Sequence, residues 1–87
     1  MDKGTQTQPD ELVIPLRKSV EFTGQVYTEM NLREPTLGEV ATAEKAGGGI
    51  ASDTVLIALV SGIPKPAVEK IGYRDAKKAR DYLMGFI

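Results

Sequence analysis

Hydrophobic and polar residues alternate along the first third of the chain, as they do along a β-strand with one buried face. Between residues 12 and 22 one face collects the apolar side chains Leu12, Ile14, Leu16, Val20 and Phe22. Pro15 interrupts this run, and because proline cannot donate to a β-ladder it belongs at an edge or a bend. After Gly24, which suits a tight turn, the alternation resumes with Val26, Thr28, Met30 and Leu32. The pattern predicts a β-hairpin.

A corner between strand and helix follows the hairpin. Residues 36–39 have the spacing of a capping box, in which Thr36 accepts from the amide of Glu39 and Glu39 accepts from the amide of Thr36. We expect five residues to form this structural corner: Arg33, Glu34, Pro35, Thr36 and Glu39. The next helix is predicted over residues 37–46, ended by the glycines at 47–49. Its packed side is predicted to hold Leu37, Val40, Ala41 and Glu44.

Three further helical segments are predicted in the second half. The run from Thr54 to Ser61 is apolar nearly all round, which is typical of a helix buried in a core or an interface. Ser52 or Asp53 is expected to cap it, and Gly62 is expected to end it. A short helix around Pro66 follows, and the last segment repeats apolar residues at helical spacing: Tyr73, Ala76, Ala79, Leu83 and Phe86. The fold class is therefore α+β, an N-terminal β-hairpin followed by three to four short α-helices.

The length of 87 residues bounds the chain to a single domain. This domain is predicted over residues 10–87. Residues 1–9 lack apolar periodicity and are predicted to form a flexible N-terminal tail. The longest apolar patch, Val55 to Val60, is six residues, far below the roughly 18–20 that a membrane span needs. We therefore expect no membrane partner.

The chain contains no cysteine and no histidine. This excludes thiolate and imidazole metal ligands and any Ser-His or Cys-His pair. The carboxylates are scattered as single residues without the spacing of a calcium loop. Asp75 and Asp81 lie among the bases of the last helix, where we expect them to form solvated ion pairs. The glycines at 47–49 lack the Lys-Ser/Thr that completes a phosphate-binding loop. We expect no catalytic residue, no metal site and no cofactor.

The net charge of −1 is distributed unevenly. Residues 1–64 hold nine acids and five bases, whereas residues 65–87 hold six bases and three acids. This polarity fits head-to-tail self-association or an acidic partner, and it also fits an ordinary solvated helix face. A nucleic-acid stripe would rest on Lys65, Lys70, Arg74, Lys77, Lys78 and Arg80. The isoelectric point of about 5.4 argues against it, so no nucleic acid is expected, and a small DNA-binding regulator is the lesser alternative.

Binding to other proteins therefore remains as the predicted function. The apolar helix contributes four candidate partner-binding residues, for self-association or for capture of a client protein: Val55, Ile57, Leu59 and Val60. The competing interpretation, that this helix fills the core of its own domain, stays open. The hairpin edge is a second candidate surface, because an exposed edge recruits other strands through backbone hydrogen bonds.

The order of these segments resembles a known family. The apolar-proline segment at 12–16 and the hairpin precede the sequence Leu-Arg-Glu-Pro-Thr at 32–36, and a Gly-Ile-Pro step at 62–64 leads to Tyr-Arg-Asp at 73–75. The set is similar to the short tail assembly chaperones of contractile-tailed, Mu-like and P2-like bacteriophages, over roughly residues 10–87. The chain departs from that pattern in its short first helix before three glycines.

The resemblance implies a non-enzymatic chaperone that acts in the host bacterial cytoplasm during tail morphogenesis. Its implied partner is the tape measure protein, which such chaperones keep soluble while tail tube subunits polymerise around it. The tail tube subunit and a second copy of the chain are further expected partners. The alternative is a structural tail completion or connector protein that stays in the virion.

Overall fold

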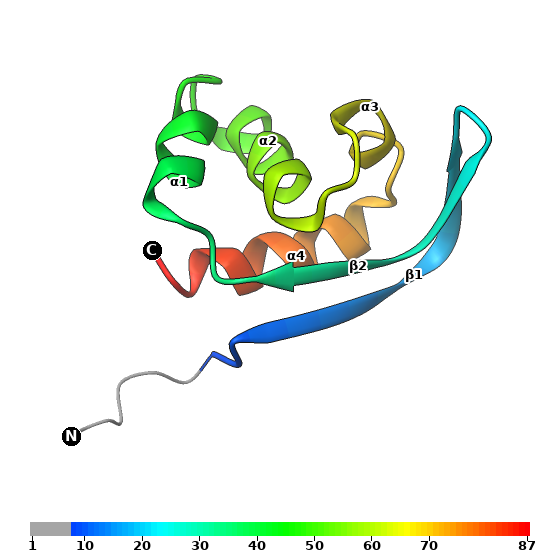
Figure 1. The fold of residues 1–87 in the computed structure, drawn as a ribbon, viewed down its shortest axis with the longest axis horizontal. Coiled ribbons are helices and arrows are strands. Elements are labelled where there is room, and N and C mark those ends of the chain that lie inside the picture. Colours follow the sequence, from blue (N-terminus) through cyan, green and yellow to red (C-terminus); the bar gives the residue numbers. More distant parts are fainter. Residues whose placement is uncertain (1–7) are drawn as a thin grey trace.

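The structure is a computed structural model that describes residues 8–87. The described chain forms a two-stranded antiparallel hairpin followed by four helices. The elements are β1 (Glu11–Phe22), β2 (Gln25–Arg33), α1 (Leu37–Glu44), α2 (Gly49–Ser61), α3 (Lys65–Val68) and α4 (Tyr73–Met84). The helices gather on one side of the long, curved hairpin (Figure 1). This arrangement confirms the predicted α+β domain.

A tail was predicted at residues 1–9, and its residues 1–7 lie outside the described residues. The two described residues of that segment contact α4. The Gln8 side-chain amide donates to the carbonyl of Tyr82 at 2.6 Å, and the Tyr82 hydroxyl donates to the carbonyl of Pro9 at 2.7 Å. The start of the described chain is therefore joined to the last helix.

The two strands pair in two registers. Toward the open end, Ile14 is opposite Met30, and toward the turn Val20 is opposite Tyr27. The register shifts between Pro15 and Val20, in agreement with the bend predicted at Pro15. In this interval β1 has residues 16–19 where β2 has residue 28 alone.

This shift corrects the prediction for β2. Val26 was expected on the buried face with Met30 and Leu32, but it is 54% exposed. Tyr27 packs against the core in its place. Because β1 has an odd number of extra residues, the face that β2 turns toward the helices reverses at the irregularity.

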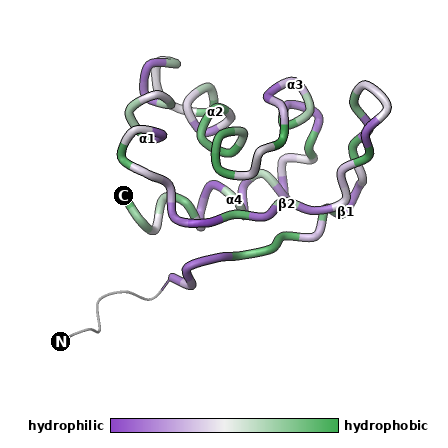
Figure 2. The backbone as a smooth tube through the Cα atoms, viewed as in Figure 1, coloured by the Kyte–Doolittle hydropathy of each residue, from purple (hydrophilic) through white to green (hydrophobic). Residues whose placement is uncertain are grey.

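The core lies between the hairpin and the helices. Its least exposed large side chains are Met30 of β2 and Leu83 of α4. The tube in Figure 2 is hydrophobic along much of α2, whereas it changes between hydrophilic and hydrophobic along α4. Both patterns follow from position, since α2 contacts α1, α3, α4 and β2 while α4 keeps one face in solvent.

The first helix packs differently from the prediction. Leu37 is 87% exposed, and Ala41 and Glu44 are also exposed, so only Val40 of the four predicted residues packs against the core. Ala43 is buried instead. The distance between packed helices depends on the side chains at their contact, and the small side chain of Ala43 lets α1 approach α2 closely.

The second helix starts five residues earlier than predicted, at Gly49 instead of Thr54. Neither predicted cap holds its N-terminus, because Gly48 is the N-cap and no side chain caps it. The Ser52 hydroxyl accepts from the amide of Gly48 at 2.8 Å. The C-terminal end of α2 is as predicted, because Gly62 follows it in the left-handed conformation at φ 78°.

Candidate functional site

Helices α2 and α4 line a shallow groove on the surface of the domain. The α2 residues are Ile50, Asp53, Thr54 and Ile57, the α4 residues are Tyr73, Ala76, Lys77 and Arg80, and Val68 of α3 joins them. On both helices these positions follow the spacing i, i+3, i+4, i+7, which places them on one face. Each helix therefore presents a single stripe to the groove.

The groove combines a buried floor with an exposed apolar rim. Ile57 and Val68 are buried, and Ala76 is partly buried. Ile50 is 67% exposed and Tyr73 is 61% exposed. Large apolar side chains that stand in solvent beside a concave surface are typical of interaction sites.

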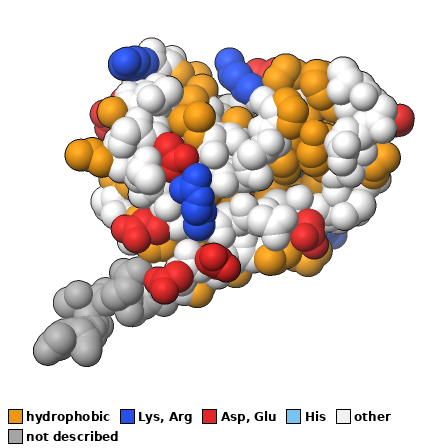
Figure 3. Space-filling view, viewed as in Figure 1, with side chains coloured by type: hydrophobic (Ala, Val, Ile, Leu, Met, Phe, Trp, Pro, Cys, Tyr) orange, Lys and Arg blue, Asp and Glu red, His pale blue; other side chains and the backbone are white. Residues whose placement is uncertain are grey.

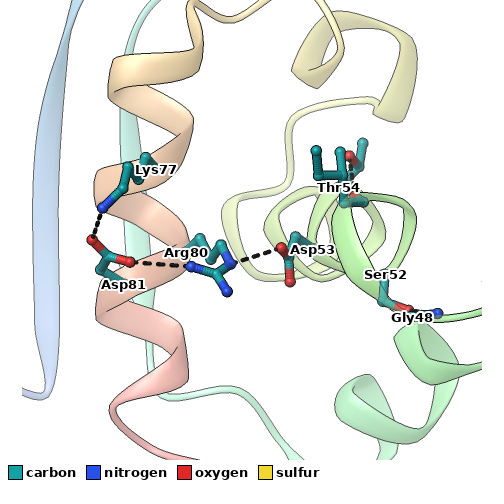
Figure 4. A network of polar contacts seen from close by, with 8 residues as sticks. Gly48, Ser52, Asp53, Thr54, Lys77, Arg80 and Asp81 are labelled. Carbon is teal, nitrogen blue, oxygen red and sulfur yellow. Dashed lines mark hydrogen bonds and ion pairs between the residues drawn. The ribbon is translucent and has the colours of Figure 1, made fainter.

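A chain of ion pairs spans the same groove (Figure 4). Arg80 Nε donates to Asp53 Oδ2 at 3.0 Å, which links α4 to α2. Asp81 joins the chain through Arg80 Nη1 at 3.4 Å and Lys77 Nζ at 3.0 Å. These side chains are partly solvated, so each pair contributes about 0–1 kcal/mol. The pairs also neutralise Lys77 and Arg80, two of the six bases that a nucleic-acid stripe would need.

Hydrophobic and acidic side chains occupy different parts of the surface in Figure 3. Hydrophobic groups reach the surface among the helices, and carboxylates gather beside the start of the described chain. Burial raises the pKa of the Tyr82 hydroxyl, and the nearby negative charges of Asp10, Glu11 and Glu34 raise it further. The open end of the hairpin is therefore acidic.

The predicted corner between β2 and α1 is tightly bonded. The capping box is present: Thr36 Oγ1 accepts from the Glu39 amide at 3.1 Å, and Glu39 Oε1 accepts from the Thr36 amide at 2.9 Å. Arg33 donates to both carboxylate oxygens of Glu39, each at 2.8 Å. The hydrogen bonds from Arg33 and then from the Thr36 amide lower the pKa of Glu39 to about 2.

The comparison with protein families matches this chain over most of its length. A family model described as "Phage tail assembly chaperone proteins, E, or 41 or 14" matches residues 13–87. The chain belongs to this family of phage tail assembly chaperones. Comparisons with curated proteins and with solved structures found no match.

Membership identifies a phage-encoded, non-enzymatic protein that binds components of the phage tail. Across residues 8–87, no group of three or more carboxylates is placed to hold a metal ion. Within the same residues, no helix has both the length and the apolarity to cross a bilayer.

The structure of the chaperone separates the four predicted partner-binding residues. Ile57 and Val60 are 3% and 6% exposed and belong to the core. Val55 is partly buried, and Leu59 is 39% exposed. Val55 and Leu59 lie on the side of α2 away from Ile57, because two residues turn a helix by about 200°. The four do not form one surface, and their binding role stays a prediction.

Sequence reasoning missed two exposed residues of the groove. Ile50 was assigned to the segment before the helix, because the three glycines indicated a stop. Tyr73 was placed on the packed side of the last helix, yet it stands at the groove rim. The shared spacing of residues 50–57 and 73–80 was the available signal, but only the packing of α2 beside α4 brings the two stripes together.

Proposed function

We propose that this chaperone binds the tape measure protein in the host cytoplasm and keeps it soluble while the tail tube assembles around it. The family supports this role, because its members assist tail assembly. The observation that carries the proposal is the α2–α4 groove, with its buried apolar floor and its exposed Ile50 and Tyr73.

The groove suits a helical client. An amphipathic helix places apolar anchors at i, i+3 or i+4 and i+7, and it binds by laying them into an apolar groove. A long client with such a stripe exposed would aggregate unless the stripe were covered. A small contact area gives weak, reversible binding. Several copies along one client then supply retention through effective concentration.

The same proposal includes two further partners. The tail tube subunit has to replace the chaperone on the client, and a second copy of the chain lies beside the first when several copies cover one client. Val55 and Leu59 are the remaining candidate contacts, because they lie on the other side of α2 from the groove floor.

Co-expression of the tape measure protein with variants of this chain tests the proposal. Burying an isoleucine contributes about 1.5–3 kcal/mol, so Ile50→Asp is expected to weaken client binding by about tenfold or more. Less tape measure protein then remains in the soluble fraction. Leu59→Asp tests the predicted contact on the other side of α2. Val13→Asp, at a residue that is 51% exposed on the hairpin, is the matched control.

The outcomes separate the alternatives. The proposal fails if the wild-type chain leaves the tape measure protein insoluble, or if neither Ile50→Asp nor Leu59→Asp lowers its solubility more than the Val13→Asp control does. Thermal unfolding checks that each variant is folded, and an unfolded Leu59→Asp protein assigns Leu59 to the core. The chaperone is expected to be absent from purified virions, whereas stoichiometric retention there supports the structural tail protein.

A further inference from the structure

Three basic side chains converge where the irregular part of β1 meets the start of α4. Arg17 and Lys18 of β1 and Arg74 of α4 line one pocket together with Gly72, Tyr73 and Asp75. In the described residues, the ion pairs involve other bases, namely Arg33, Lys77 and Arg80. The three cations of this pocket therefore have no carboxylate partner within residues 8–87.

The N-terminus of α4 adds to this positive charge. Gly72 is its N-cap, and no side chain caps the helix. The first amides of a helix point outward without an intrahelical acceptor, and the helix dipole places partial positive charge there. With its 12 residues, α4 is long enough for a substantial dipole. The pocket thus offers hydrogen-bond donors as well as cations.

Asp75 introduces an acceptor into the same pocket. Its side chain is buried, with 2% of the residue exposed. Asp75 Oδ2 accepts from the backbone amide of Arg17 at 2.8 Å. Asp75 Oδ1 is also buried and has no hydrogen-bond partner in the described chain. A buried polar atom without a partner is costly, so Oδ1 favours a ligand that brings a donor.

These groups restrict the kind of ligand. A simple anion would pair with the bases but leave Oδ1 unsatisfied, and a metal ion would meet Oδ1 but be repelled by three cations. The DNA backbone brings phosphates but no hydrogen-bond donor for Oδ1. A peptide supplies both needs, since its backbone N–H donates and its acidic side chains pair with the bases.

We propose that this pocket binds an extended, acidic segment of a partner protein. Because Oδ1 is covered in the free chain, the segment displaces the exposed side chains around it as it binds. Its backbone N–H then donates to Asp75 Oδ1, and its carboxylates pair with Arg17, Lys18 and Arg74. The register shift at residues 16–19 leaves β1 irregular at the pocket, which gives an extended segment space beside it. The pocket meets the α2–α4 groove at Tyr73, and the proposal does not depend on the identity of the client in that groove.

An NMR titration of the full chain tests the proposal. The probe is an acetylated and amidated pentapeptide, alanine-aspartate-glutamate-aspartate-alanine. It is expected to shift the amide signals of Arg17, Lys18, Tyr73 and Arg74. The same peptide with asparagine and glutamine in place of the acids is expected to bind at least tenfold more weakly, as is the Arg74→Glu variant with the acidic peptide. Thermal unfolding confirms that this variant is folded.

A matched control and a modified peptide sharpen the test. Lys45→Glu makes the same charge change at the end of α1, a helix that contacts α2 but neither α4 nor β1. The affinity of this variant is expected to stay within about twofold at 0.15 M salt, where distant charges are screened. A peptide N-methylated at its acidic residues keeps its charges but loses the donors. It is expected to bind several-fold more weakly.

Several results would overturn the proposal. One is equal weakening by Lys45→Glu and Arg74→Glu, which would indicate general charge attraction. Another is equal affinity for the N-methylated peptide, which would exclude the contact to Asp75 Oδ1. Binding of inorganic phosphate or duplex DNA at the same residues with equal or higher affinity would assign the pocket to phosphate. Self-association of the chain that the peptide reverses would assign it to a contact between copies.

Discussion

Two corners join the hairpin to a helix, and each places a carboxylate at the third residue of that helix. At the α1 corner, Glu39 accepts from the Thr36 amide and from both terminal nitrogens, Nη1 and Nη2, of the Arg33 guanidinium. At the α4 corner, Asp75 accepts from the Arg17 amide through Oδ2 alone. The carboxylate at the α1 corner is fully bonded within the chain. At the α4 corner, Asp75 Oδ1 has no hydrogen-bond partner in the described residues, and Arg17, Lys18 and Arg74 form none of the ion pairs there.

A carboxylate at the third residue of a helix therefore has different roles at the two corners. A carboxylate near a helix N-terminus is stabilising in both places, because it meets the positive end of the helix dipole. At α1 its partners are adjacent in sequence, so the corner determines the path of the chain. At α4 its partner is 58 residues away along the chain, so a carboxylate at the same helix position holds a distant strand and lines a surface pocket.

Removing the carboxylate at the α4 corner is expected to have the largest effect on stability. Asp75→Ala leaves the Arg17 amide without its acceptor, which costs about 1–3 kcal/mol in the free energy of unfolding. Urea denaturation measures this loss. Asp81→Ala on the same helix is the control, since the Asp81 side chain is 53% exposed, and its change is expected to stay within about 0.5 kcal/mol. Equal stability of the two variants would show that Asp75 does not hold β1.

Removing the cap at the α1 corner is expected to have a smaller effect. Thr36→Ala deletes the acceptor of the Glu39 amide, and loss of such a cap costs about 1 kcal/mol. Thr36→Ser keeps a hydroxyl in place and is expected to unfold at nearly the wild-type denaturant concentration. If the alanine and serine variants unfold together, the hydrogen bond from the Glu39 amide to Thr36 contributes nothing measurable.

The smallest expected effect is a dependence of stability on acid pH. Because the folded state lowers the pKa of Glu39 to about 2 from its ordinary value of 4.5, the ionised form favours folding. This contribution is fully present above about pH 5 and is lost as the pH falls toward 2. The Arg33 side chain is 43% exposed, so solvent screening limits the contribution to about 1 kcal/mol.

Denaturation curves measured between pH 2 and pH 6 check this prediction. In Glu39→Gln, that part of the acid-induced loss is expected to disappear. An unchanged pH profile in this variant would mean that other carboxylates cause the loss. Added salt is expected to reduce the wild-type contribution, because the Arg33–Glu39 pair is exposed.

Local sequence patterns determined a large part of this fold. Alternation predicted the hairpin, and the spacing of Thr36 and Glu39 predicted the capping box that the structure contains. Gly62 was expected to end α2, and its left-handed conformation does so. Each of these features depends on groups only a few residues apart, and such short-range preferences are readable from the order of residue types.

Only the tertiary structure decided which surfaces of these elements are available. The register shift in β1 turns Val26 outward, and the packing of α2 beside α4 leaves Ile50 and Tyr73 exposed on one groove. Asp75 was expected to lie in a solvated ion pair on α4, but it is buried against β1 and bonded to the Arg17 amide. The burial of a side chain depends on which distant segments pack against it. The hydrogen bond between Arg17 and Asp75 joins residues 58 positions apart, so no local sequence pattern predicts it.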